Sequence, residues 1–134
     1  MTDTKSITFH LVDDNDIDIA VNTKLLQIVQ LSDQVYTYGG GVRFINELKA
    51  GGEKFEGRHN VVLLDIMMPV MNGFDCLEYM QAMPEEQRSR FTVYMLSSTI
   101  DRNDIQRAEA YPLVQKVLEK PLDVYLLKKS LEDL

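Results

Sequence analysis

The sequence has one cysteine, Cys76, and two histidines, His10 and His59. A single cysteine excludes an internal disulfide, and so few cysteine and histidine side chains argue against a zinc site. His10 lies inside an apolar run and is expected in the core, whereas His59 is expected in a loop. The N-terminal residues lack a basic stretch followed by a long apolar run. We therefore find no signal peptide or membrane span and expect a cytoplasmic protein.

Basic residues are also scarce. The 14 Lys and Arg residues face 21 Asp and Glu residues, which gives a formal net charge of -7. This balance argues against nucleic acid as a direct partner, because phosphate contacts need clustered basic side chains. The remaining composition, 45% hydrophobic and 26% charged over 134 residues, is typical of one globular domain. We find no repeat or linker and expect a single domain over residues 1–134.

Short apolar runs alternate with segments of helical periodicity along the chain. Strands are expected at residues 7–12, 34–38, 61–65, 91–96 and 113–118. Helices are expected at 17–31, 42–50, 72–83, 101–110 and 123–134. The apolar face of the first helix is expected to comprise Ile17, Val21, Leu25, Ile28 and Val29. Five strands alternating with five helices predict an α/β fold, with a parallel sheet and right-handed helical connections.

Polar residues capable of phosphate chemistry follow four of these strands. Ligands of such sheets bind outside the carboxyl ends of the strands, so these residues are expected to share one pocket. Clustered carboxylates favour a cation, Mg²⁺ prefers oxygen ligands, and a carboxylate can also attack phosphorus. Asp16 and Asp18 are expected as acids at the start of the first helix, where the helix dipole favours them. The pocket residues are Asp13 and Asp14 after the first strand, Asp65 after the third, Ser97 after the fourth, and Lys120 after the fifth.

Taken in order, Asp13-Asp14, Asp65 within DIMMPVMNG, Ser97 and Lys120-Pro121 resemble the receiver domain of two-component response regulators. The resemblance covers essentially the whole chain. It implies a flavodoxin-like fold with strand order 2-1-3-4-5 and five flanking helices. It also implies a cis Lys120–Pro121 bond.

The resemblance also implies the site roles. Asp65 would accept phosphate, Asp14 would bind Mg²⁺ directly, and Asp13 would hold the shell of the metal through water. The main-chain carbonyl of Met67 would be a further metal ligand. Lys120 would pair with one phosphoryl oxygen, and Ser97 would move on activation to donate its hydroxyl to another.

The implied partners are a sensor histidine kinase, or a histidine-containing phosphotransfer protein, as phosphate donor. The chain would be a stand-alone receiver without an output domain, catalysing only its own phosphorylation and dephosphorylation. Phosphate would switch the binding of a downstream protein or pass onward in a relay. The fourth helix, the fifth strand and the fifth helix would form the surface for the downstream partner, without nucleic acid or membrane.

The sequence departs from the family at three places. Val117 stands where the family has Tyr or Phe, Leu113-Val114 replaces Gly-Ala, and Ser98 replaces Ala. The usual aromatic relay is therefore missing, and Tyr94 or Tyr111 could substitute for it. Two alternatives remain open. The chain could be a receiver-like interaction module that works without phosphorylation, or a small Mg²⁺-dependent phosphatase of the haloacid dehalogenase type with an aspartate nucleophile.

Overall fold

The computed structural model describes residues 7–31, 34–99 and 101–134, and it confirms the five expected strands to within two residues at each end. The strands are β1 (Ile7–Val12), β2 (Val35–Tyr38), β3 (His59–Asp65), β4 (Phe91–Ser97) and β5 (Val114–Glu119). The helices are α1 (Asp16–Ile28), α2 (Gly41–Ala50), α3 (Gly73–Gln81), α4 (Glu85–Arg88), α5 (Arg102–Glu109) and α6 (Val124–Glu132). A 3₁₀ turn, η2 (Glu53–Phe55), precedes β3.

The strands form one parallel sheet in the order β2-β1-β3-β4-β5, as the resemblance implied. Val12 at the end of β1 lies beside Leu64 of β3, and Asp65 lies beside Leu96 of β4. The carboxyl ends of β1, β3 and β4 therefore meet at the same edge of the sheet. This edge carries the candidate site.

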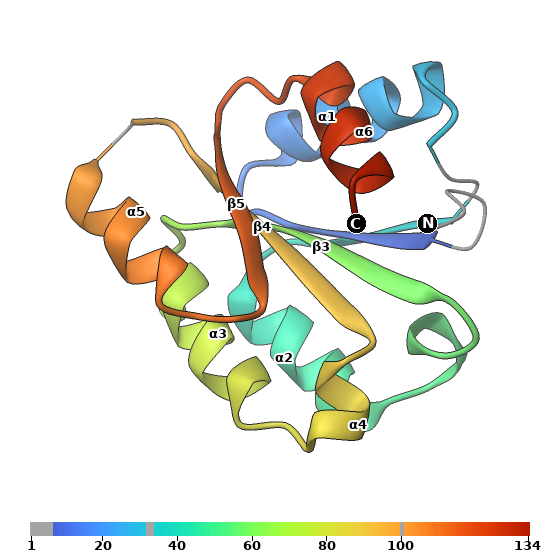
Figure 1. The fold of residues 1–134 in the computed structure, drawn as a ribbon, viewed down its shortest axis with the longest axis vertical. Helices are drawn as coiled ribbons and strands as arrows, with labels where there is room; N and C mark the ends of the chain where they lie inside the picture. Colours follow the sequence, from blue (N-terminus) through green and yellow to red (C-terminus); the bar gives the residue numbers. More distant parts are fainter. Residues whose placement is uncertain (1–6, 32–33, 100) are drawn as a thin grey trace.

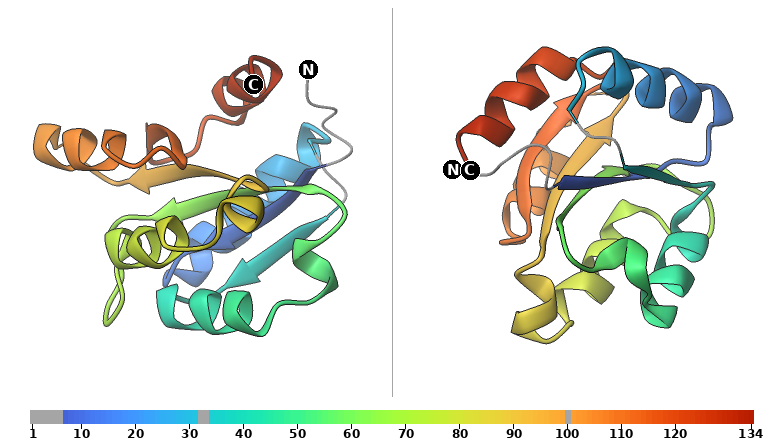
Figure 2. Two further views of the ribbon diagram at one scale, coloured as in Figure 1. Left: turned by 60° about the horizontal axis from the view of Figure 1, so that its bottom comes forward. Right: turned by 90° about the vertical axis from the view of Figure 1, so that its right-hand side faces the viewer.

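Helices cover both faces of the sheet, which explains why its central strands read as continuous apolar runs. Figure 1 shows α1 and α6 on one face and α2, α3 and α5 on the other, and Figure 2 shows the same layers from two other directions. Along β3, Val61 and Leu63 join the core beneath α1 and α6, while Val62 and Leu64 join the core beneath α2 and α3. Among the described residues, every helix is too short or too polar to cross a lipid bilayer.

The structure corrects the expected number of helices and the place of His59. The helix expected at 72–83 ends at Gln81, but Pro84 then serves as the N-cap of a short extra helix, α4. Arg88 of α4 donates hydrogen bonds to the carbonyl oxygens of Gln81 and Met83, at 3.0 and 3.1 Å, and so satisfies the end of α3. His59 is the first residue of β3 instead of a loop residue, and its Nε2 lies 2.7 Å from Thr92 Oγ1.

The expected apolar face of α1 is only partly correct. Leu25 and Val29 pack against the core, but Ile17, Val21 and Ile28 are exposed. The residues that α1 buries most fully are Asn22 and Leu26. Three of the five side chains expected in this apolar face are thus left on the surface.

His10 is the core histidine that the sequence predicts, and it joins the first three strands. It is fully buried in β1, with Nδ1 2.9 Å from Tyr38 Oη on β2 and Nε2 2.9 Å from Asn60 Oδ1 on β3. Because Asn60 donates its amide to the Phe55 carbonyl at 3.0 Å, its Oδ1 is assigned as the acceptor from His10 Nε2–H. Tyr38 then donates its hydroxyl hydrogen to Nδ1. Burial lowers the pKa of His10 to about 4, so the ring is neutral.

Candidate functional site

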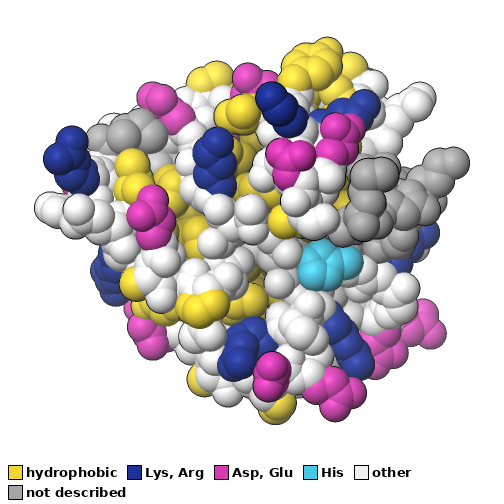
Figure 3. All heavy atoms as spheres, in the orientation of Figure 1, with side chains coloured by type: hydrophobic (Ala, Val, Ile, Leu, Met, Phe, Trp, Pro, Cys, Tyr) yellow, Lys and Arg dark blue, Asp and Glu magenta, His cyan; other side chains and the backbone are white. Residues whose placement is uncertain are grey.

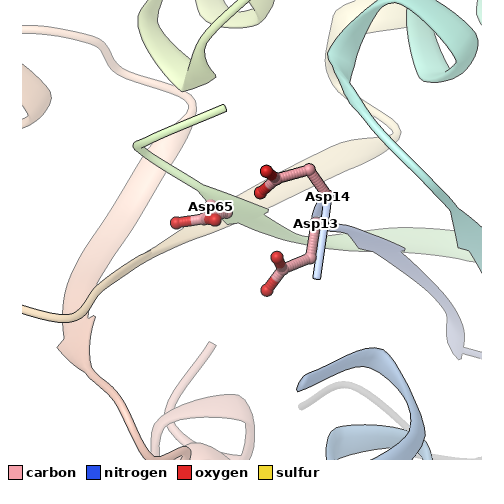
Figure 4. Close-up of side chains that lie close together, drawn as sticks. All are labelled: Asp13, Asp14 and Asp65. Atoms are coloured by element: carbon pink, nitrogen blue, oxygen red, sulfur yellow. The ribbon is translucent and has the colours of Figure 1, made fainter. Parts of the chain in front are cut away.

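Three carboxylates meet at the carboxyl edge of the sheet. Asp13 and Asp14 directly follow β1, and Asp65 is the last residue of the neighbouring strand β3. One oxygen from each of the three lies within 4.8 Å of the others. Figure 4 shows the Asp13 and Asp14 carboxyl groups extending from the end of β1 towards the same region as Asp65. Asp13 and Asp65 are buried, whereas Asp14 is exposed.

The turn after β1 holds Asp13 in place. Asp13 Oδ1 accepts a hydrogen bond from the backbone N–H of Asn15 at 2.9 Å. The Asn15 side chain in turn caps α1 by accepting from the N–H groups of Ile17 and Asp18, at 2.9 and 3.1 Å. The start of α1 and the position of Asp13 are therefore fixed by the same short turn.

Gly73 brings the start of α3 directly against Asp65. A Cβ at this position would lie 2.6 Å from the Asp65 carbonyl oxygen and 3.0 Å from Ile66 Cα, so no larger residue fits without a backbone shift. The Gly73 N–H also donates to the Ile66 carbonyl at 2.9 Å. The structure thus gives Gly73 a role in fixing the end of β3.

Lys120 places its ammonium group among the carboxylates. Its Nζ lies 2.9 Å from Asp13 Oδ2, 3.0 Å from Asp18 Oδ2 and 3.3 Å from Asp65 Oδ2. It follows β5, and its bond to Pro121 is cis, as the resemblance implied. Sequence analysis missed the contact with Asp18, because an acid in the first turn of a helix is explained by the helix dipole alone.

Ser97 and Met67 flank the carboxylates. Ser97 is buried at the end of β4 and donates its hydroxyl to the Thr99 carbonyl, while the Thr99 N–H lies 3.3 Å from Ser97 Oγ. Among the described residues, no hydrogen bond joins Ser97 to Asp65. Met67 donates its N–H to Asp65 Oδ1 at 3.3 Å, and its side chain is exposed. Ser97 therefore lies beside the cluster with its hydroxyl engaged elsewhere.

The electrostatics of the site show an excess of negative charge. Burial raises the pKa of Asp65 to about 6, and the charge of Asp13 adds to this rise, while Lys120 and the Met67 N–H oppose it. Burial works against the charged form of Lys120, but hydrogen bonds to Asp13 and Asp18 and the charge of Asp65 outweigh it and raise its pKa. One ammonium thus contacts three carboxylates, those of Asp13, Asp18 and Asp65.

The donor set fits Mg²⁺. Asp13, Asp14 and Asp65 offer hard carboxylate oxygens, two of these residues are buried, and the exposed Asp14 leaves the cluster open to solvent. Burial is the main cause of the raised pKa of Asp65, and a divalent cation would offset the smaller contribution from the charge of Asp13. The residues present are therefore suited to a magnesium ion held by these carboxylates together with water.

The structure separates the two tyrosines considered as substitutes for the missing aromatic relay. Tyr94 faces the core beneath α1 and α6, where its hydroxyl lies 2.7 Å from Ser130 Oγ, so it is on the wrong side of the sheet. Tyr111 packs on the opposite core with Val117 and hydrogen-bonds to Glu78 of α3. Only Tyr111 lies on the α5 side.

Comparisons with known proteins agree with this geometry. The family model for the response regulator receiver domain matches residues 9–132. The fold resembles that of a response regulator receiver protein from Dyadobacter fermentans, with 35% identity, 95% of this chain and 96% of that chain covered, and a TM-score of 0.85. A two-component response regulator from Cytophaga hutchinsonii has 26% identity, 96% coverage of both chains and a TM-score of 0.81.

A chemotaxis protein of Vibrio cholerae, CheY4, has 21% identity, covers 96% of this chain and 98% of its own, and has a TM-score of 0.70, which supports the fold. No curated protein matches the chain. Receiver domains are signalling domains for which aspartate phosphorylation and Mg²⁺ binding are family features. On its sequence match and its fold, the chain belongs to the response regulator receiver domain family.

Proposed function

We propose that this receiver domain accepts a phosphoryl group from a phosphohistidine of a partner protein onto Asp65, in a reaction that requires Mg²⁺. The observation that carries the proposal is the cluster of Asp13, Asp14, Asp65 and Lys120 at one edge of the sheet. Crowding carboxylates around one half-buried ammonium is a poor way to stabilise a fold. The same arrangement suits phosphoryl transfer, which depends mainly on positioning and charge neutralisation.

Three side chains have separate roles in the proposed phosphoryl transfer. One carboxylate oxygen of Asp65 attacks phosphorus while the phosphorus–nitrogen bond to the donor histidine breaks, and the departing imidazole takes a proton from solvent. Lys120, already 3.3 Å from Asp65, pairs with one phosphoryl oxygen. Ser97 releases the Thr99 carbonyl and donates its hydroxyl to another.

The metal ligands in this proposal are Asp14, Asp65 and the Met67 carbonyl, with Asp13 acting through water. When bound, Mg²⁺ neutralises charge on the phosphoryl oxygens. The ligands lie at the end of β3 or in the short segments that follow β1 and β3, so the sheet itself sets their separation.

The exposed apolar residues of α1 support a docking surface for the donor protein. Ile17, Val21 and Ile28 are 73%, 46% and 61% exposed, and α1 begins at the site itself, because Asp18 in its first turn contacts Lys120. A protein that delivers phosphate to Asp65 must approach over this turn. Replacing Val21 by Lys should therefore slow transfer from a donor protein without slowing transfer from a small phosphodonor.

The surface proposed for the downstream partner comprises α5, β5 and α6, which correspond to the expected fourth helix, fifth strand and fifth helix. β5 is an edge strand, and α6 exposes Tyr125 and Leu126. Figure 3 shows basic and acidic side chains interspersed over one face of the molecule, which suits a protein partner better than a polyanion.

The test is intact-protein mass after incubation with phosphoramidate, a small donor with a phosphorus–nitrogen bond. With Mg²⁺ present, we expect one phosphate on the wild type and none on Asp65→Asn; removing Mg²⁺ with EDTA should abolish the addition. Asp16→Asn is the matched control, because Asp16 is an exposed acid near the site that lies outside the carboxylate cluster. Phosphate on Asp65→Asn would contradict the assignment of the acceptor.

A receiver that works without phosphorylation is the second candidate, and Val117 is the observation that favours it. Absence of phosphate on the wild type, with phosphoramidate and with acetyl phosphate, would support this candidate. Turnover of p-nitrophenyl phosphate would instead indicate a phosphatase.

A further inference from the structure

Helix α5 is attached to the rest of the protein by few buried side chains. Ala108 is its one fully buried residue, and the helix is otherwise half-buried or exposed. Its N-cap, Asp101, follows Ser97 and Thr99 closely in the chain and accepts a hydrogen bond from the Asn103 N–H at 2.8 Å. Weakly buried elements are those that shift most readily. α5 is therefore placed to respond when Ser97 changes partner.

Two side-chain contacts with α3 also hold α5 in place. The Arg107 guanidinium carbon lies 4.1 Å from the ring centroid of Phe74, within the range of a cation–π interaction. Tyr111, just beyond α5, donates its hydroxyl to the Glu78 carboxylate. Phe74 and Glu78 are four residues apart, as are Arg107 and Tyr111, so the two contacts lie one helical turn apart.

The α3 side of these contacts is fixed to the phosphorylation site. Phe74 is buried and directly follows Gly73, which packs against the carbonyl of Asp65 and hydrogen-bonds to Ile66. The α5 side is joined by the chain to Ser97. The two contacts therefore bridge a helix whose first residue packs against Asp65 and a helix that begins shortly after Ser97 in the chain.

We propose that Phe74, Glu78, Arg107 and Tyr111 form a clasp between α3 and α5 that sets how often α5 leaves its resting position before Asp65 is phosphorylated. This inference rests on the proposed function. Val117 of β5 occupies the position of the family's aromatic residue. This chain therefore has no aromatic ring at that position to rotate when Ser97 moves. The clasp contacts then oppose the displacement of α5 that accompanies the movement of Ser97. Phosphorylation displaces α5 when it breaks these contacts.

Amide hydrogen exchange of α5 in the unphosphorylated protein tests the clasp. In Arg107→Ala, α5 amides should exchange about two- to fivefold faster, the effect of losing an exposed cation–π pair. Tyr111→Phe, which removes only the hydroxyl, should also accelerate them, and the double variant should do so most. Arg102→Ala is the matched control, because Arg102 is an exposed arginine on the same helix. Exchange in α2 should stay unchanged in all variants.

Amide chemical shifts test the link to phosphorylation. Beryllofluoride with Mg²⁺, a mimic of the phosphoryl group, defines the switched position of each α5 amide in the wild type. The resting shifts of Arg107→Ala and Tyr111→Phe should move part of the way along the line from the wild-type resting position to that switched position. Arg102→Ala should remain at the resting position.

Three results would overturn the clasp. The α5 amides of both clasp variants could exchange at the wild-type rate, or those of Arg102→Ala could be accelerated as much as those of the clasp variants. The resting amide chemical shifts of the clasp variants could also fall off the line that joins the wild-type resting and switched positions. The clasp would also be overturned if beryllofluoride left the amide chemical shifts of α5 unchanged in wild-type protein that does accept phosphate on Asp65. Failure to take phosphate at all counts against the proposed function instead. Hydrogen exchange is measured on the unphosphorylated protein. It therefore tests whether these contacts hold α5 even if the protein does not accept phosphate.

Discussion

Lowering the pH from 7 to 5 should destabilise the fold through His10. Burial holds the pKa of this histidine at about 4 in the folded protein, against the usual 6.5. Between these values the unfolded chain binds the proton and the folded protein does not, so the free energy of unfolding falls as the pH falls. At about 1.4 kcal/mol per pKa unit, the complete loss is roughly 3 kcal/mol, and roughly 2 kcal/mol of it occurs between pH 7 and 5.

Asp65 acts with the opposite sign in the same range and must be removed from the measurement. Because its pKa is raised to about 6, protonation below that pH favours the folded state. The comparison is therefore made between Asp65→Asn and the same protein carrying His10→Gln, which cannot be protonated. Glutamine keeps an amide donor and acceptor for the Tyr38 and Asn60 positions.

The assay is urea unfolding followed by far-ultraviolet circular dichroism at pH 7, 6 and 5. Asp65→Asn should lose about 2 kcal/mol more of its unfolding free energy than the double variant between pH 7 and 5. Parallel losses in the two proteins would refute the reasoning. So would a titration of the His10 ring by NMR with a midpoint near that of a free histidine.

Further substitutions test the surroundings of Asp65. Gly73→Ala should lower the free energy of unfolding by about 1–3 kcal/mol and slow phosphorylation, because the added Cβ would lie 2.6 Å from the Asp65 carbonyl oxygen. Urea unfolding would measure the first effect and a time course of intact mass the second. Val70 has a φ of 67° and is 94% exposed, so Val70→Gly should raise the unfolding free energy by about 1 kcal/mol, whereas Val70→Ala should give little gain. Lys120→Met should slow acceptance of phosphate by more than about tenfold in a time course of intact mass, because no other cation lies among these carboxylates in the described residues. An unchanged rate would contradict the role given to Lys120.

The site was largely predictable because a parallel sheet converts chain order into proximity. Asp65 ends a strand, Asp13, Asp14 and Lys120 come directly after strands, and the carboxyl ends of parallel strands share one edge. β3 was equally clear, because a strand covered on both faces is apolar throughout. The end of the strand then fixes where Asp65 must lie.

Other features depend on packing that one sequence does not reveal. The apolar face of α1 was misassigned because Ile17 and Ile28 are apolar yet exposed, and apolar residues are common on protein surfaces. The four-residue helix α4 is too short to show a periodicity. The pairing of Asp18 with Lys120 joins residues 102 positions apart, and the sequence near Asp18 explained the acid without it.

Mapping the phosphate within the chain tests the central claim most directly. Protein phosphorylated with phosphoramidate and Mg²⁺ would be reduced with borohydride, which converts an aspartyl phosphate to homoserine, and its peptides would then be sequenced by mass spectrometry. Homoserine at position 65 alone is the predicted result. Homoserine at position 13 or 14, or an unreduced peptide containing Asp65 in protein that carries phosphate, would contradict it.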